Sequence, residues 1–375
     1  MEYWVWLNQL RGIGPITQKK LLAHFKTPQR IYASSEDELV SVPGMGSALA
    51  QSIGEARSLD GAFCVLEQLH QQNMKVLVYD DPLYPDLAKA WPAAPLVLYY
   101  LGTIRKSGVG LGIVGSRRCS AYGKQVAVEA AEFLAQQDIP VISGLAKGID
   151  GYAHTACLKA GGYTIAFLGN GLDLCYPKEH RALQAAIIEN GAVISRYLPG
   201  TKPRPEHFPQ RNGLISSWSR KLLVAEAAEK SGALSTAQFA KALNREILVP
   251  PHEIYRTSGQ GTNRLLKNGA TLYLKPAQLI FSAAPFLSET DEMAAPVTTS
   301  PSNRLPKRSP RKLTPDEAKI QAVLISSEKN IQQIEALTGI DQVHLIEQLA
   351  IMELEGLVTL SGSGCYKLTD EEPFY

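Results

Sequence analysis

Hydrophobic residues in the central part of the chain fall into short, nearly continuous runs. Most of these runs are rich in β-branched residues, as is typical of strands buried on both faces of a sheet. They are Gly110–Val114, Ile139–Ile142, Thr164–Leu168, Ala192–Ile194, Leu222–Ala225 and Ile247–Val249. Between several runs, stretches such as Ala121–Gln137 and Lys178–Glu189 have the periodicity of amphipathic helices. This alternation predicts an α/β fold with a Rossmann-like parallel sheet.

The flanking segments have different patterns. Residues 1–75 are predicted to form a helical domain, and residues 76–282 an extended Rossmann-like domain whose first part, 76–108, looks like a connector. Residues 283–312 are rich in Pro, Ser and Thr, which predicts a flexible linker. Its basic end either touches a nucleic-acid backbone or, as we favour, is simply solvated. Residues 313–375 are predicted to form a small helical domain.

Composition excludes several classes of protein. The net charge of +2 over 375 residues gives no global field for nucleic acid, so any anion site must be local. The five cysteines are widely spaced, which argues against a zinc site or a disulfide framework. The chain lacks a signal-peptide pattern and a long apolar run. We therefore expect a reduced, cytoplasmic protein without a membrane segment.

Glycine-bearing turns follow the first three predicted strands. The first contains Gly115, Ser116 and Arg117, the second Ser143, Gly144 and Lys147, and the third Gly169–Asp173. Such turns let the backbone approach a ligand, and the following helix N-termini attract anions. An arginine adds a charged fork suited to phosphate. In a parallel sheet the turns share one edge, so together they predict a row of donors for several phosphates. Ser120 either joins this site or only caps the next helix.

Several cofactor and catalytic patterns are missing. No G-x-G-x-x-G follows the first strand, and no Walker lysine motif is present. Asp150 and His154 share a helix face, where a structural role is favoured over a metal or acid–base pair. No nucleophile–base–acid constellation can be assembled from the spacing. We predict no catalytic residue, no metal and no cofactor.

The proline-rich segment Pro203–Asn212 follows the fourth predicted strand. It is predicted to be a stiff loop that exposes Arg204, Phe208 and Arg211. An aromatic ring between two cations is a plausible platform for one unstacked base. The alternative is a structural loop with Phe208 in the core. We favour the platform, because Arg211 and Asn212 would then point back over the same sheet edge.

Six motifs in order resemble the DNA-processing protein A (DprA/Smf) family over residues 84–275. They are Val114–Arg117, Ser143–Asp150 with Ala153-His154, Gly169–Asp173 with Tyr176-Pro177, Phe208–Asn212, Glu226-Ala227 with Ser231–Ala237, and Gly261–Asn263 with Gly269-Ala270. The resemblance implies an extended Rossmann domain, an N-terminal helical domain and a C-terminal winged helix. It also implies a non-enzymatic homodimer that binds and protects single-stranded DNA and loads the RecA recombinase during natural transformation.

The resemblance also assigns roles to residues. Arg117 corresponds to the family's main DNA-contacting arginine, and the remaining expected DNA-binding residues are Gly115, Ser116, Ser143, Gly144, Lys147, Phe208, Arg211 and Asn212. Two departures are visible. Gly213 stands where the family usually has an arginine, and Ser195-Arg196 where it usually has Ser-Glu. The first departure implies one cation fewer in the groove.

The flanking domains fit the same resemblance. Leu10–Gly14 and Val42–Gly46 resemble two helix-hairpin-helix turns of a SAM-like pair, which either bind DNA phosphates or are purely structural. In the C-terminal domain, Ile331–Thr338, a turn at Gly339, a helix from Gln342 to about Glu355 and the segment Leu357–Tyr366 resemble a winged helix with its wing tip at 361–364. Its second helix carries Asp341, Glu347, Glu353 and Glu355. An acidic face suits duplex DNA poorly, so a protein contact is favoured.

Two enzymatic alternatives are considered. Nucleotide-processing hydrolases of the lysine-decarboxylase-like type also place glycine turns over a phosphate. Their Gly-Gly-rich second turn with an arginine and a glutamate is absent from this sequence. A nuclease would need a carboxylate cluster for two magnesium ions, and the sequence shows none.

Overall fold

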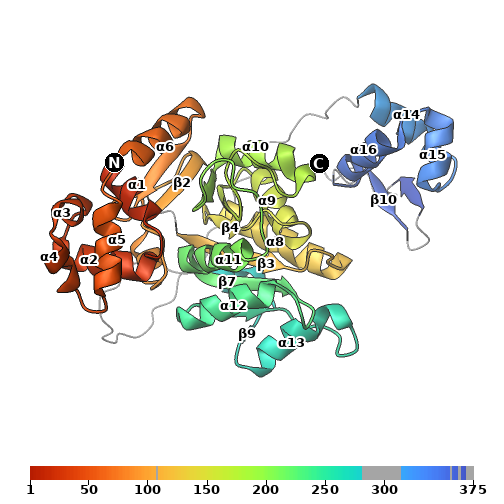
Figure 1. Ribbon diagram of the computed structural model, residues 1–375. Coiled ribbons are helices and arrows are strands. Elements are labelled where there is room, and N and C mark those ends of the chain that lie inside the picture. Colours follow the sequence, from red (N-terminus) through yellow and green to blue (C-terminus); the bar gives the residue numbers. More distant parts are fainter. Residues whose placement is uncertain (107–108, 281–313, 355–356, 362–364, 369–375) are drawn as a thin grey trace, which may run out of the picture. The chain divides into compact units, whose positions relative to one another are not determined.

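The computed structural model describes residues 1–106, 109–280, 314–354, 357–361 and 365–368 (Figure 1). The predicted linker 283–312 lies outside the described residues, as does most of the predicted wing tip. The chain divides into two compact units, Met1–Pro285 and Phe286–Tyr375, and each is considered by itself. No described helix is both long enough and apolar enough to cross a lipid bilayer.

A nine-stranded sheet forms the centre of the first unit, in the order β1-β2-β6-β5-β4-β3-β7-β8-β9. The strands are β1 Lys75–Val78, β2 Val97–Gly102, β3 Gly110–Gly115, β4 Val141–Ser143, β5 Thr164–Leu168, β6 Ala192–Ser195, β7 Ser219–Glu226, β8 Glu246–Val249 and β9 Thr271–Leu272. All neighbouring strands in the part of the sheet with the order β6-β5-β4-β3-β7-β8-β9 are parallel. β2 pairs antiparallel with both β1 and β6. The predicted α/β class is confirmed. Treating 76–108 as a connector was wrong, because this segment contains β2 and most of β1.

Helices cover both faces of the sheet (Figure 1). They are α8 Ala121–Gln136, α9 Ile149–Lys159, α10 Arg181–Asn190, α11 His207–Trp218, α12 Ala233–Ala242 and α13 Gln260–Lys267. Successive side chains of β3 alternate between two cores. Ile113 packs into the core that contains Leu134 of α8, whereas Val114 packs into the core that contains Trp218 of α11.

The N-terminal helices share a core with the sheet. They are α1 Glu2–Gln9, α2 Pro15–Phe25, α3 Pro28–Ala33, α4 Glu36–Val40, α5 Ser47–Glu55 and α6 Asp60–Gln71. Leu7 and Leu21 belong to the same buried cluster as Val97 and Tyr99 of β2. The ammonium group of Lys19 donates to the carbonyl of Trp91 at 2.6 Å. The described unit therefore has no solvent layer between these helices and β2.

The second unit has three helices followed by a β-hairpin. α14 Pro315–Leu324, α15 Ile331–Thr338 and α16 Gln342–Leu354 precede β10 Val358–Leu360 and β11 Tyr366–Leu368, which pair antiparallel. Gly339 ends α15 at a φ of 66°, in the left-handed region that favours glycine. This order of elements agrees with the winged-helix prediction. Of the predicted acidic side chains, Glu347 and Glu355 lie outside the described ones.

Candidate nucleic-acid interface

The candidate site lies where the strand order reverses. β3 pairs with β4 on one side and with β7 on the other, although two strands, β5 and β6, lie between β4 and β7 in the sequence. Loops at such a point diverge and leave a crevice beyond the carboxyl ends of the strands. The turns after β3, β4 and β5 all open into this crevice.

The turn after β3 is fixed at its two ends. The backbone N–H of Ser116 donates to the carbonyl of Glu226 at 2.8 Å, and the Ser116 hydroxyl donates to the carbonyl of Arg118 at 3.0 Å. Ser120 caps α8 by accepting from the N–H of Gly123 at 3.2 Å, as one of the two sequence interpretations proposed. Between these anchors Arg117 is exposed. The turn therefore presents two exposed cations, Arg117 and Arg118, on a backbone that is held at both ends.

The turn after β4 lies against the turn after β3. Gly148 has a φ of +74°, and a Cβ at this position would lie 2.3 Å from the carbonyl oxygen of Ser116. Only glycine permits this approach. The N–H of Ile149 then donates to the carbonyl of Ser116 at 3.2 Å. The two turns form one connected surface.

Ser143 and Gly144 are buried beneath that surface. The Ser143 hydroxyl donates to the carbonyl of Ile113 at 2.6 Å, and the N–H of Gly144 donates to the carboxylate of Asp150 at 3.2 Å. The N–H of Ala146 donates to the same carboxylate oxygen at 3.4 Å. The prediction of free donors was therefore wrong at Ser143, Gly144 and Ala146, because groups within the protein already accept their hydrogen bonds. In this structure Ser143 and Gly144 support the turn.

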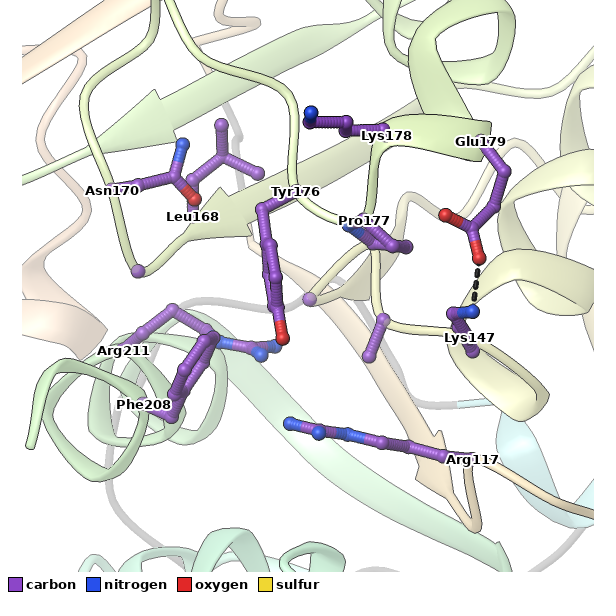
Figure 2. Close-up of a pocket in the computed structure, with 13 residues that line it drawn as sticks. Arg117, Lys147, Leu168, Asn170, Tyr176, Pro177, Lys178, Glu179, Phe208 and Arg211 are labelled. Carbon is purple, nitrogen blue, oxygen red and sulfur yellow. Dashed lines mark ion pairs between the residues drawn. The ribbon is translucent and has the colours of Figure 1, made fainter. Parts of the chain in front are cut away.

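Lys147 is the member of the second turn that reaches the crevice. Its side chain is more than half exposed and forms an ion pair with Glu179 at the rim (Figure 2). The pair is exposed and screened by solvent, so it is a weak interaction.

The Pro203–Asn212 segment differs from the predicted loop. Helix α11 already begins at His207, and Arg211 on it is only 5% exposed. The Arg211 guanidinium lies 3.6 Å from the Asp150 carboxylate. Burial raises the pKa of Asp150 and lowers the pKa of Arg211, and the opposite charge of each partner opposes both shifts. The prediction that Arg211 is exposed was wrong. Its charge is largely neutralised within the protein.

His154 also has a structural environment. Its Nδ1 lies 2.7 Å from the hydroxyl of Thr164, which itself donates to the carbonyl of Val141. The Nδ1 atom therefore carries the hydrogen. Burial lowers the pKa of His154 to about 3, so the ring is neutral near pH 7. This supports the structural interpretation of Asp150 and His154 over an acid–base pair.

Phe208 lies half-buried at the centre of the crevice. Its ring centroid is 5.8 Å from that of Tyr176, and the Arg117 guanidinium lies 5.6 Å from the Phe208 ring. Figure 2 shows Arg117 and Tyr176 directed toward the same space from opposite sides. This space is a pocket of about 350 Å³ with Leu168 and Pro177 also in its wall. Its wall is mainly apolar and its rim is cationic.

A second hollow continues from the first on the other side of Arg117 and Phe208. It has a volume of about 500 Å³ and is lined by Ser116, Arg118 and Asn212, among others. The two hollows together are called the Arg117 groove below. Sequence reasoning had given no role to Tyr176 or Arg118, although Tyr176-Pro177 lay in a recognised motif. Among the described residues, no cluster of three or more His, Cys, Asp or Glu side chains could hold a metal.

Gly213 faces away from the Arg117 groove. A Cβ at this position would lie 2.5 Å from the Trp91 ring, so no larger side chain fits without moving that ring. The absence of an arginine at 213 therefore removes no charge from the groove in this structure. At the other departure, the Arg196 guanidinium lies 5.9 Å from the Tyr197 ring, and burial lowers its pKa.

The fold and site define a Rossmann-type protein with a groove bordered by cations at its topological switch point. The chain belongs to the family of DNA recombination-mediator protein A, whose profile matches residues 75–284. Residues 7–56 match a SAM-like helix-hairpin-helix tandem, which confirms that sequence prediction.

Individual relatives cover most of the chain. It is 34% identical to Protein Smf of Synechocystis over 95% of this chain and 96% of that protein. The X-ray structure of DNA processing protein A from Streptococcus pneumoniae superposes with a TM-score of 0.66 at 28% identity, covering 75% of this chain and 99% of that chain. The Helicobacter pylori protein, described for its single-stranded DNA binding mode, superposes with a TM-score of 0.50 at 28% identity, covering 55% and 93%.

Proposed function

We propose that the chain binds single-stranded DNA in the Arg117 groove. The observation that carries the proposal is the exposed Arg117 guanidinium beside Phe208, at the mouth of a mainly apolar pocket. Arg117 and Lys147 would hold consecutive phosphates, and Ser116 and Asn212 would extend the contacts into the second hollow. Family membership and the Helicobacter pylori relative support the same ligand.

The pocket favours a single strand over a duplex. Phe208 and Tyr176 offer ring faces at a recess of about 350 Å³, and only an unstacked base can turn its face toward such rings. A duplex keeps its bases stacked and presents only its backbone to Arg117. We therefore expect tight binding of oligo-dT and weak binding of a duplex of equal length.

Family membership supports a wider biological role. In this proposal the protein is a non-catalytic recombination mediator in the cytoplasm that protects incoming single strands, and hands them to RecA during natural transformation. It works as a homodimer. Light scattering on the purified protein tests the dimer, and RecA filament formation on protein-coated oligo-dT tests the transfer.

The groove is tested by fluorescence anisotropy with labelled oligo-dT at several salt concentrations. Arg117→Ala should weaken binding at least tenfold and reduce the slope of log affinity against log salt by about 0.7, because one phosphate contact is lost. Lys159→Ala is the control, because Lys159 is an exposed cation in the last turn of α9, at the opposite edge of the sheet. Wild-type affinity in the Arg117 variant would refute the site.

The stacking contact and the enzymatic alternative need separate measurements. Phe208→Ala should weaken oligo-dT binding about tenfold with an unchanged salt slope, since stacking on one base contributes about 1–3 kcal/mol and involves no counterion. Incubation with nucleoside monophosphates should release no base. Release at steady turnover would replace this proposal with the hydrolase.

A further inference from the structure

A buried carboxylate lies beneath the turn that carries Arg117. Glu226 ends β7 and is 0% exposed. Its backbone carbonyl accepts from the N–H of Ser116, and its carboxylate accepts from the N–H of Ser120 at 3.0 and 3.2 Å. The Ser120 hydroxyl also donates to this carboxylate. A single residue therefore holds both ends of the turn from Ser116 to Ser120.

The surrounding packing leaves Glu226 little freedom. A Cβ at Gly123 would lie 2.9 Å from the Cβ of Glu226, and a Cβ at Gly115 would lie 2.9 Å from its carbonyl oxygen. Both glycines thus allow the backbone on each side of the turn to approach Glu226. The carboxylate cannot serve as an anion site itself, because it is negative. Its role must be exerted through the groups that it binds.

His252 packs behind the carboxylate without a hydrogen bond to it. Its Nε2 lies 3.9 Å from a carboxylate oxygen of Glu226, and its Nδ1 lies 3.1 Å from the carbonyl of Pro250, so Nδ1 carries the hydrogen. Asn263 clamps the backbone of His252 with hydrogen bonds of 3.1 and 3.0 Å. The Tyr122 ring packs edge-on against His252, with ring centroids 5.1 Å apart. The motif containing Asn263 is thereby connected to the turn that carries Arg117.

We propose that Glu226 is a positioning residue for DNA binding: it fixes the Ser116–Ser120 turn so that Arg117 stands beside Phe208. This inference rests on the proposed function of the Arg117 groove. Without the carboxylate, the N–H and hydroxyl of Ser120 lose their buried acceptor and the end of the turn is released. Arg117 would then sample many positions, and DNA would have to order it on binding.

The test combines hydrogen exchange with DNA affinity on the full-length protein. Hydrogen–deuterium exchange of the peptide covering residues 116–123 reports on the turn without DNA. Glu226→Ala should exchange at least tenfold faster there and bind oligo-dT at least tenfold more weakly. Glu226→Gln keeps an acceptor of the same shape and should restore both to within about threefold of wild type. Glu189→Ala, which removes an exposed carboxylate at the end of α10, is the control.

Two comparisons separate this role from a general loss of structure. In an Arg117→Ala background, Glu226→Ala should cause no further loss of affinity, because it acts through Arg117. If Glu226→Ala does not fold, Ser120→Ala removes the hydroxyl that donates to Glu226 and caps α8, with Glu226 in place, and should give faster exchange and a three- to tenfold loss of affinity.

Three results would overturn the inference. They are wild-type exchange in Glu226→Ala, faster exchange with wild-type affinity, and an additive loss in the Arg117→Ala background. Failure of the proposed function looks different. The single Arg117→Ala variant would then bind oligo-dT as wild type does, whereas the exchange experiment contains no DNA.

Discussion

Replacing Arg211 with methionine removes one half of a buried ion pair while keeping a long side chain in place. Asp150 would remain buried, with hydrogen bonds from the N–H groups of Gly144 and Ala146 at 3.2 and 3.4 Å and with the Ser143 side chain also in contact, but without a counterion. A buried carboxylate in this position either stays charged without a counterion or takes up a proton. The variant therefore measures how much of the role of Arg211 is structural.

Protonation of Asp150 sets an upper limit on the loss of stability in the Arg211→Met variant. At pH 7, protonating a carboxyl with an unfolded pKa of about 3.9 costs about 4 kcal/mol, since each pH unit corresponds to about 1.4 kcal/mol. Breaking a buried pair typically costs about 3–5 kcal/mol. We expect Arg211→Met to lower the free energy of unfolding by about 3–4 kcal/mol at pH 7. Adding Asp150→Asn should recover most of this loss.

The pH dependence has a definite sign. In the Arg211→Met variant the folded state holds a proton on Asp150 that the unfolded chain has lost at pH 7. The deficit relative to wild type should therefore shrink by about 1.4 kcal/mol per pH unit as the pH falls from 7 toward 5. Urea unfolding followed by circular dichroism measures it. A deficit below about 1 kcal/mol with no pH dependence, together with lost oligo-dT binding, would show that Arg211 is a groove cation after all.

Three further predictions follow from other contacts. Glu179→Gln frees Lys147 from its ion pair and should raise oligo-dT affinity two- to fivefold in anisotropy titrations, about the range of an exposed pair; unchanged or weaker binding would exclude Lys147 from the groove. Because the folded pKa of His154 is about 3, the unfolded chain binds a proton there below pH 6.5 that the folded protein does not. Stability should thus fall by up to about 1.4 kcal/mol per pH unit between 6.5 and 3, and the slope should flatten in His154→Gln; an unchanged slope would contradict the assignment. Gly213→Ala pushes a Cβ against the Trp91 ring, and this overpacking should lower the free energy of unfolding by about 1–3 kcal/mol. The melting temperature should fall accordingly, while the folded protein keeps its affinity for oligo-dT.

Six of the seven described parallel strands could be predicted from their apolar runs, because strands buried on both faces are almost continuously apolar, whereas the two-residue strand β9 was not predicted. The run Thr164–Leu168 coincides with β5, and all five residues are buried. β2 was missed because it follows a segment rich in proline and aspartate that reads as a turn. β2 pairs with β6, a strand almost a hundred residues later in the chain. The local sequence pattern cannot predict a pairing between segments so far apart.

The sequence predicted which residues lie at the site better than it predicted how their side chains are arranged. The prolines of the 203–212 segment suggested a loop, yet Pro209 lies in the first turn of α11, where its missing N–H leaves no helical hydrogen bond unmade. The helix turns Arg211 inward to Asp150. Likewise, the sequence shows that Ser143 and Gly144 follow a strand, but whether their polar groups are already satisfied depends on Ile113 and Asp150, which only the folded structure brings to them.

The core shared by the N-terminal helices and β2 has an evolutionary consequence. Val97 and Tyr99 are fully buried and belong to one cluster with Leu7 and Leu21. A homologue that had lost these helices would expose to water the part of that face of β2 that α10 does not cover. We expect such proteins to carry polar residues at the positions of Val97 and Tyr99. Their β2 would then alternate between polar residues on the face that the helices once covered and apolar residues on the other face.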